Sequence, residues 1–218
     1  EPFMSIVNTF SLQSNRQIKI NFDGGDLSSD AGLLLIKEFA TKIGFVKLIK
    51  KKFKTNDKSI RFHKDHENLL QMIYQIISAY FQDDCADELT LDPVFHAVLD
   101  KESLASQPTL SRFFNRMDED TLLQFNDIDK NLRDIVYSIK RPEHVLLDLD
   151  STLLGTYGKQ EGERFNFHYQ AHGYHPLLCY DGLTGDLIKA ELHDGTLYCS
   201  NGADKFMKSI FQEYLERG

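Results

Sequence analysis

The sequence predicts a mixed α/β fold of the α+β kind: a helical N-terminal region followed by a domain that starts with three antiparallel strands. Three observations support this prediction. Apolar residues recur at helical spacing through most of residues 31–139. The apolar run from Val145 to Leu149 follows Pro142, which blocks a helix from running into it, and indicates a buried strand. Beyond it, the short turn Asp181–Asp186 joins two strand-like segments, and so short a connection requires antiparallel neighbours.

Composition limits the classes of protein to which the chain can belong. Its 218 residues suffice for one large or two modest domains, and a change in texture near Lys140 places the boundary between regions 1–140 and 141–218. No apolar run approaches the roughly 20 residues needed to cross a membrane. Cys85, Cys179 and Cys199 lack metal-type spacing, so we interpret them as reduced thiols of a cytoplasmic protein. The net charge of −8 by itself weakly disfavours a nucleic-acid partner.

The first region is predicted to be a series of helices. A short strand is expected at Gln17–Phe22 and a turn at Asp23–Asp26, and Ser28–Asp30 sets up the cap of the helix that follows. The expected helices are Ala31 to about Gly44, His66–Phe81, one starting at Pro93, and Thr121–Ile139. The acidic run Asp83–Glu88 is interpreted as a solvated loop or helix start, with metal binding as the alternative.

A basic stretch interrupts these helices. Residues Lys37 to Lys64 hold ten Lys and Arg residues against Glu38 and Asp57. Two interpretations are open. The stretch is either a solvated helix face or a phosphate-contacting patch centred on Lys50, Lys51 and Lys52.

The segment Ser103–Asn115 has the pattern of a helix-turn-helix recognition element. A turn around Leu104 precedes a helix start at Gln107, and three polar side chains, Gln107, Thr109 and Arg112, are then available for DNA. A plain helical hairpin explains the same pattern, so both interpretations remain open.

The second region alternates strands with turns. We expect a strand ending at Thr152, a loop at Leu153–Arg164, strands at Phe165–Gln170, Leu177–Tyr180 and Leu187–Leu192, and a helix at Lys205–Glu216. His168, His172 and His175 suit no single metal geometry, and we expect hydrogen-bonded imidazoles there. Lys159, in the loop after the first strand, is a candidate DNA contact.

Asp148 and Asp150 are the candidate chemical centre. Alternation along a strand places both side chains on one face, where burial is costly unless a divalent cation offsets the charge. The stretch DLDSTL resembles the first motif of haloacid-dehalogenase-like phosphatases. That resemblance implies Asp148 as nucleophile, Asp150 as general acid/base and a required Mg²⁺. Such a fold needs parallel strands and a crossover helix, which the turn Asp181–Asp186 does not provide.

The order of three antiparallel strands and then a helix instead resembles ribonuclease-H-like nucleotidyl transferases. Several ordered motifs make the resemblance specific: the sequence is similar to bacterial insertion-sequence transposases of the DDE class from about Phe22 onward. The motifs are Leu104–Arg112, Asp150–Thr152, Tyr157–Gly162, Phe165–Tyr169, Gly173–Leu177 and Asp181–Asp186. The resemblance implies cut-and-paste DNA transposition, Mg²⁺ or Mn²⁺ as cofactor, double-stranded DNA with terminal inverted repeats as substrate, and a homodimer.

Within that resemblance Asp150 matches the first catalytic, metal-binding aspartate, and Asp148 is interpreted as a supporting carboxylate. The helical region 1–140 would bind DNA and dimerise, through Lys50, Lys51, Lys52, Gln107, Thr109 and Arg112, with Lys159 added from the second region. Such a domain needs a fourth strand with a second Asp and a late helix with a Glu, but only one helix follows the hairpin, and we find no later strand to carry a second metal-binding carboxylate. The sequence therefore predicts an incomplete ribonuclease-H-like domain with an unfinished sheet edge, inactive in cleavage alone. A non-catalytic DNA-binding remnant is the third interpretation.

Overall fold

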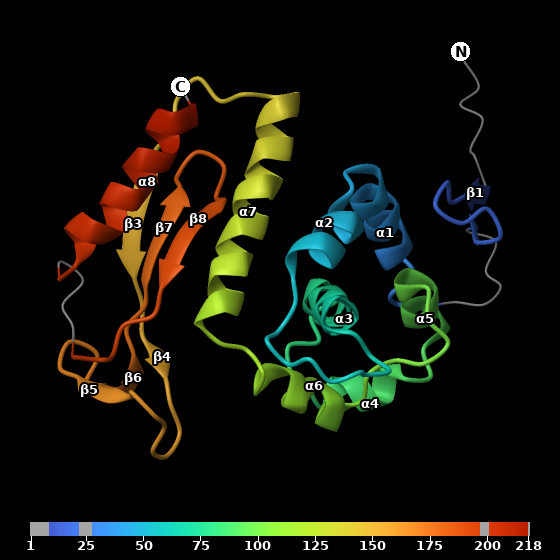
Figure 1. Cartoon of the computed structure of the whole chain (residues 1–218), viewed down its shortest axis with the longest axis horizontal. Helices are drawn as coiled ribbons and strands as arrows, with labels where there is room; N and C mark the ends of the chain where they lie inside the picture. The colour runs from blue at the N-terminus through green and yellow to red at the C-terminus, as the bar shows by residue number, and fades with distance from the viewer. Residues whose placement is uncertain (1–8, 22–27, 197–200, 218) are drawn as a thin grey trace, which may run out of the picture. The chain divides into compact units, whose positions relative to one another are not determined.

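The computed structural model describes residues 9–21, 28–196 and 201–217 (Figure 1). The chain forms two compact units, residues 1–136, called the helical unit below, and residues 137–218, called the sheet unit. The predicted turn at 23–26 and Cys199 lie outside the described residues. Among the described residues, no helix is both long and apolar enough to cross a membrane.

Helices dominate the helical unit, with α3 packed against α2, α5 and α6 (Figure 1). Its strands are β1 (Thr9–Ser11) and β2 (Lys19–Asn21), which pair antiparallel. Its helices are α1 (Leu33–Lys42), α2 (Phe45–Lys52), α3 (Asp65–Ile77), α4 (Cys85–Leu89), α5 (Pro93–Leu99), α6 (Gln107–Phe114) and α7 (Glu119–Ile139), the last running into the sheet unit. β2 and most of the helices agree with the periodicity of the sequence.

Two of the apolar clusters that stabilise this unit are built around a buried phenylalanine. One contains the fully buried Phe95 together with Leu33 and Val98. The other contains Phe113, which is also fully buried and meets the ring of Phe53 edge-on at 5.9 Å. Burying each such side chain contributes about 1.5 to 3 kcal/mol to folding.

Helix ends show where local sequence signals hold and where they fail. Gly44 ends α1 in a left-handed conformation, φ 75°, as predicted for a glycine at this position. Asp92 caps α5 by accepting the N–H of Val94 at 2.7 Å. The predicted cap of the first helix at Ser28–Asp30 is wrong. Gly32 occupies the cap of α1 without a side-chain bond, and Asp30 instead accepts the hydroxyl of Tyr80 at 3.0 Å.

The third helix is shorter than predicted. α3 ends at Ile77 rather than Phe81, because Ala79 adopts a left-handed backbone with φ 66°. The N–H of Tyr80 then returns to the carbonyl of Gln75 at 2.9 Å and closes the helix end. No glycine marks this stop, so the sequence pattern carried no signal for it.

The sheet unit contains two three-stranded antiparallel sheets and one helix among the residues that the structure describes. The first sheet has the order β3 (Leu147–Ser151), β7 (Leu177–Asp181), β8 (Leu187–Glu191). The second has the order β4 (Leu154–Gly155), β6 (Ala171–Tyr174), β5 (Arg164–Asn166). The helix α8 (Ala203–Arg217) covers the first sheet with Phe206 and Ile210. The predicted mixed fold with three antiparallel strands followed by a helix is confirmed.

Two predictions for the segment between β3 and β7 are wrong. The expected loop 153–164 contains β4, and the expected strand 165–170 stops at Asn166. Asn166 ends the strand because its side-chain oxygen accepts the N–H groups of His168 and Tyr169 at 2.9 and 3.0 Å, which bends the chain. Gln170 then turns with φ 53°, and β6 begins.

Candidate functional site

The acidic strand β3 carries the candidate site. β3 pairs antiparallel with β7, with Asp148 opposite Tyr180 and Asp150 opposite Leu178. Residues directly opposite in such a pair share a face, so both carboxylates lie on the same face as Tyr180 and Leu178. Val145 and Leu147 alternate with them and pack on the other face, against the cluster of α8.

The carboxylate face is open. Leu146 is 56% exposed and Leu187 is 42% exposed on this side, and both aspartates are exposed. The expectation of a buried strand is therefore wrong for this face, because only one face of the sheet is covered by α8. Burial does not oblige the carboxylates to bind a cation. Asp150 instead accepts the N–H of Ser151 at 2.7 Å and is otherwise directed at solvent.

The donor set suits a hard divalent cation in part. Two carboxylates on one strand face provide the oxygen ligands that Mg²⁺ prefers, and Mg²⁺ is commonly held by one or two carboxylates with water and substrate oxygens. Over the described ranges, no group of three His, Cys, Asp or Glu side chains gathers as a metal site. Asp148 and Asp150 thus form an open, partial set of ligands.

The edge of β3 opposite β7 has no partner strand in the part of the chain that the structure describes. The main-chain groups on this edge can pair with another strand. The acidic residues therefore lie next to an edge that can extend the sheet.

The histidines near this strand have local partners. His172 contacts Glu163 at 2.7 Å through Nδ1, and the ring of His175 lies edge-on to Tyr169 at 5.9 Å. The ring of His168 lies edge-on to Tyr169 at 4.7 Å. His172 therefore has the expected side-chain hydrogen bond, and the rings of His168 and His175 pack against Tyr169.

The three lysines predicted as a phosphate patch have different surroundings. Lys52 forms an ion pair with Asp127 at 2.6 Å, so α7 already neutralises its charge. Lys50 and Lys51 are exposed at the end of α2. Lys50 acts on His66, whose pKa is lowered mainly by burial and further by the charges of Lys50, Lys64 and Lys101, against an opposing effect of Glu67.

Folding adds a lysine to the predicted basic stretch 37–64 and forms a cationic cluster around His66. Lys50, Lys64 and Lys101 come from three separate segments and act on one imidazole. Lys101 forms an ion pair with Glu67 at 2.7 Å, so Lys50 and Lys64 are the outward charges of this cationic cluster. Lys50 and Lys64 belong to the predicted basic stretch, and only folding brings Lys101, which lies far along the chain, to the same imidazole.

The predicted recognition helix α6 begins against acidic residues. The side chain of Gln107 donates to Asp83 at 2.9 Å, and its N–H donates to Asp87 at 2.9 Å. Thr109 shares a hydrogen bond of 3.1 Å with Ser106. Arg112 is exposed.

The start of α6 therefore faces carboxylates, which repel phosphate. Arg112, further along α6, presents its positive charge to solvent, and Lys159 lies exposed in the turn-rich loop before β5. The structure thus separates the candidate residues into exposed cations and residues with internal partners.

A comparison with protein families matches the sequence to a known family. The profile of the family described as transposase DDE domain, group 1, matches residues 10–218, nearly the whole chain. No curated protein and no solved structure matches the sequence. Transposases of this family generally use a divalent metal ion and act on DNA. The chain therefore belongs to the DDE-domain transposases of insertion-sequence type.

Proposed function

We propose that the chain takes part in DNA transposition by metal-dependent phosphodiester cleavage and strand transfer at transposon ends. The observation that carries this proposal is the position of Asp150. It is exposed on the first strand of an antiparallel sheet, β3–β7–β8, that is followed by a helix. An open carboxylate face admits both a cation and a DNA backbone.

Asp150, with Asp148 on the same face, would hold Mg²⁺ or Mn²⁺. When bound, such a metal would make a water or a 3′-hydroxyl more acidic and would neutralise charge on the phosphate under attack. Asp150 positions the cation, and Asp148 adds negative charge two residues away on the same side of the strand.

The helical unit is proposed to bind the inverted repeats as double-stranded DNA. Lys50 and Lys51 are exposed at the end of α2, and the cluster with Lys64 adds to their field. Arg112 and Lys159 remain candidate contacts. Gln107, Thr109 and Lys52 would first have to leave their partners in the protein. We further propose that two copies act together, one at each transposon end, in the cytoplasm.

Metal binding tests the role of Asp150 without requiring cleavage. Mn²⁺ titrated into the full chain and followed by electron paramagnetic resonance should bind the wild type. Asp150→Asn should weaken binding by roughly tenfold or more, since even residues outside the ligand shell change metal affinity by that much. Asp204→Asn, the same change on α8, is the matched control and should leave binding unchanged. Equal Mn²⁺ binding by wild type and Asp150→Asn contradicts the role of Asp150.

The salt dependence of DNA binding tests the role of the lysines. A duplex of arbitrary sequence, titrated by fluorescence anisotropy, reports phosphate contacts. Replacing Lys50 and Lys51 together with Ala should lower the slope of log affinity against log salt by about 0.9 for each phosphate that a lysine no longer neutralises. Lys52→Ala, which removes a lysine already paired with Asp127, should change the slope little. Identical slopes for the wild type and both variants would exclude these contacts.

Two alternatives remain as outcomes of these tests. DNA binding without Mn²⁺ binding favours a non-catalytic DNA-binding protein. Hydrolysis of a phosphate monoester that is abolished in Asp148→Asn favours the haloacid-dehalogenase chemistry, in which Asp148 is the nucleophile. The antiparallel pairing of β3 with β7 supports the transposase assignment over that chemistry.

A further inference from the structure

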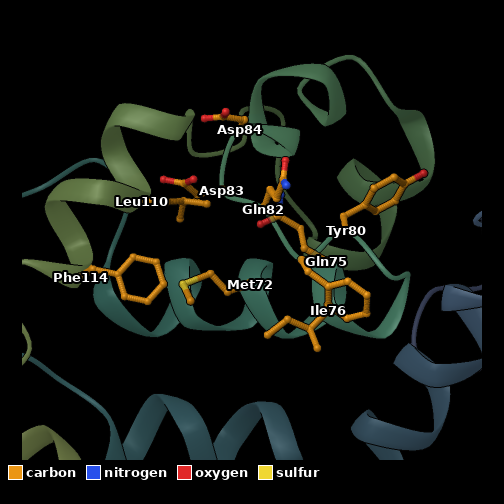
Figure 2. Close-up of a pocket in the computed structure, with 10 residues that line it drawn as sticks. Met72, Gln75, Ile76, Tyr80, Gln82, Asp83, Asp84, Leu110 and Phe114 are labelled. Atoms are coloured by element: carbon orange, nitrogen blue, oxygen red, sulfur yellow. The ribbon is translucent and has the colours of Figure 1, made fainter. Parts of the chain in front are cut away.

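A groove on the helical unit combines apolar walls with an acidic rim, and we call it the acidic groove (Figure 2). Its cavity measures about 560 Å³. Figure 2 shows Met72, Ile76 and Phe114 along one side and the carboxylates of Asp83 and Asp84 on the other. Ile76 is 53% exposed and Phe114 is 46% exposed, so large apolar surfaces here face solvent.

A buried donor at this groove points to a ligand with hydrogen-bond acceptors. Gln75 lines the groove and is only 3% exposed, yet its Nε2 finds no acceptor among the described residues. A buried amide without an acceptor is unfavourable, so an occupant that brings a carbonyl oxygen to it gains affinity. A segment of polypeptide provides such carbonyls at every residue.

The same unit exposes a segment with the complementary character. In residues 58–64, KSIRFHK, called the 58–64 loop here, Ile60 is fully exposed and Phe62 is 78% exposed. Lys58 and Lys64 flank these two residues, and both lysines are exposed. Lysines at both ends of an apolar pair match a groove whose rim carries Asp83 and Asp84.

The loop is held in place rather than loose. Asp57 accepts the N–H of Ser59 at 2.8 Å and pairs with Arg61. The ring of Phe62 lies edge-on to His63 at 4.8 Å. A loop with a fixed shape loses less conformational entropy when it binds. Asp57 neutralises Arg61, so the exposed charges left on the loop are Lys58 and Lys64 beside the two apolar side chains. This combination matches a groove with apolar walls and an acidic rim.

We propose that the acidic groove binds the 58–64 loop of a second copy of this chain. Ile60 and Phe62 would enter the apolar groove, Lys58 and Lys64 would face Asp83 and Asp84, and a loop carbonyl would accept the amide of Gln75. Two such contacts related by a two-fold axis close a dimer. This inference rests on the self-association proposed above, and it is independent of the role of Asp150.

Sedimentation of the full chain without DNA or metal, over a wide range of protein concentration, tests the contact. Phe62→Asp in the loop and Ile76→Asp in the groove should each weaken dimerisation by about tenfold or more, as for the loss of an anchor residue at an interface. Phe167→Asp, the same change at an aromatic residue that is 81% exposed in the sheet unit, is the control and should leave it unchanged.

Mixing the two variants gives the sharper result. Phe62→Asp retains an intact groove and Ile76→Asp an intact loop, so the mixture should associate more strongly than either variant alone. Asp150→Asn should dimerise like the wild type, which separates this inference from the proposed function.

Three results would overturn the proposal. A wild-type chain that stays monomeric removes the contact. If Ile76→Asp weakens dimerisation and Phe62→Asp does not, the groove binds a segment other than the 58–64 loop. Unchanged dimerisation with weakened duplex binding in Phe62→Asp assigns the loop to DNA.

Discussion

The two units of the chain differ in how their central elements are covered: α3 is surrounded by other helices, whereas the main sheet of the sheet unit is covered by α8 on one face only. In the helical unit, α3 is held by polar contacts as well as apolar packing: the side chain of Gln71 bonds both the N–H and the carbonyl of Ala105 at 2.8 Å. The main sheet of the sheet unit is packed against α8 on one face, while its other face presents Asp148 and Asp150 to solvent. The buried core of the helical unit contributes to stability, and the exposed face with Asp148 and Asp150 is accessible to a ligand.

The largest expected effect tests the closed core. Phe113→Ala should lower the free energy of unfolding of the helical unit by about 3 to 5 kcal/mol, because it empties a fully buried site against Phe53. Chemical denaturation measures the change, and hydrogen exchange in α2 and α3 locates it. A change in the free energy of unfolding well below this range would mean that neighbouring side chains move into the space and that the core is loosely packed.

The next test compares neighbouring residues on α8. Ile210→Ala should cost about 2 to 5 kcal/mol, because Ile210 is buried against the sheet. Phe211→Ala, next in sequence but half exposed, should change stability by no more than about 0.5 kcal/mol. Denaturation of the two variants side by side gives the difference. Equal destabilisation would show that both sides of α8 are covered.

An intermediate effect is expected at the ion pair of Asp65 and Arg116, 2.9 Å apart. Burial acts to raise the pKa of Asp65, but hydrogen bonds from Thr55 and Arg116 outweigh it and lower that pKa below its usual value. Asp65→Asn should therefore destabilise the helical unit by about 1.5 to 3 kcal/mol at neutral pH.

The pH dependence of that destabilisation has a defined sign. Because the folded pKa is lowered, the contribution of Asp65 is complete above the unfolded value of about 3.9 and disappears as the pH falls through the lower folded pKa. The difference between wild type and Asp65→Asn should thus shrink in acid. A difference in unfolding free energy that does not change with pH contradicts the role of this carboxylate.

The smallest effect is expected for the same substitution on the open face. Asp150→Asn should alter the free energy of unfolding by no more than about 0.5 kcal/mol, because the side chain is exposed. Together with weakened Mn²⁺ binding, an unchanged melting curve would separate function from stability. A large decrease in stability would place Asp150 in the folded core instead.

Local sequence was sufficient for elements with strong periodicity or punctuation. The end of α1 at Gly44, the cap of α5 at Asp92 and the turn at Asp181 follow from residue types that suit those backbone shapes. It failed at Ala79 and at Asn166, where a left-handed alanine and a side-chain bond to the following N–H groups end a helix and a strand. Neither stop changes the apolar pattern from which the element is predicted.

For the candidate site, too, the sequence predicted some features and not others. Alternation in β3 is enough to place Asp148 and Asp150 on one face, and the ordered motifs around them indicate the transposase family. The surroundings of the predicted DNA contacts could not be predicted. Gln107 donates a hydrogen bond to Asp83, and Lys52 forms an ion pair with Asp127. Each of these partners lies far along the chain from the residue that it binds.

The sequence by itself determined the antiparallel start of the sheet unit, the shared face of the two aspartates and the family, because turns, alternation and ordered motifs can be recognised along the chain without knowing which segments pack together. Only the tertiary structure decided that this face is open, that Lys101 joins Lys50 and Lys64 around His66, and that an apolar groove carries an acidic rim. Packing and charge depend on which distant segments fold against each other. A side chain is buried, neutralised or left exposed by neighbours that its own stretch of sequence does not contain.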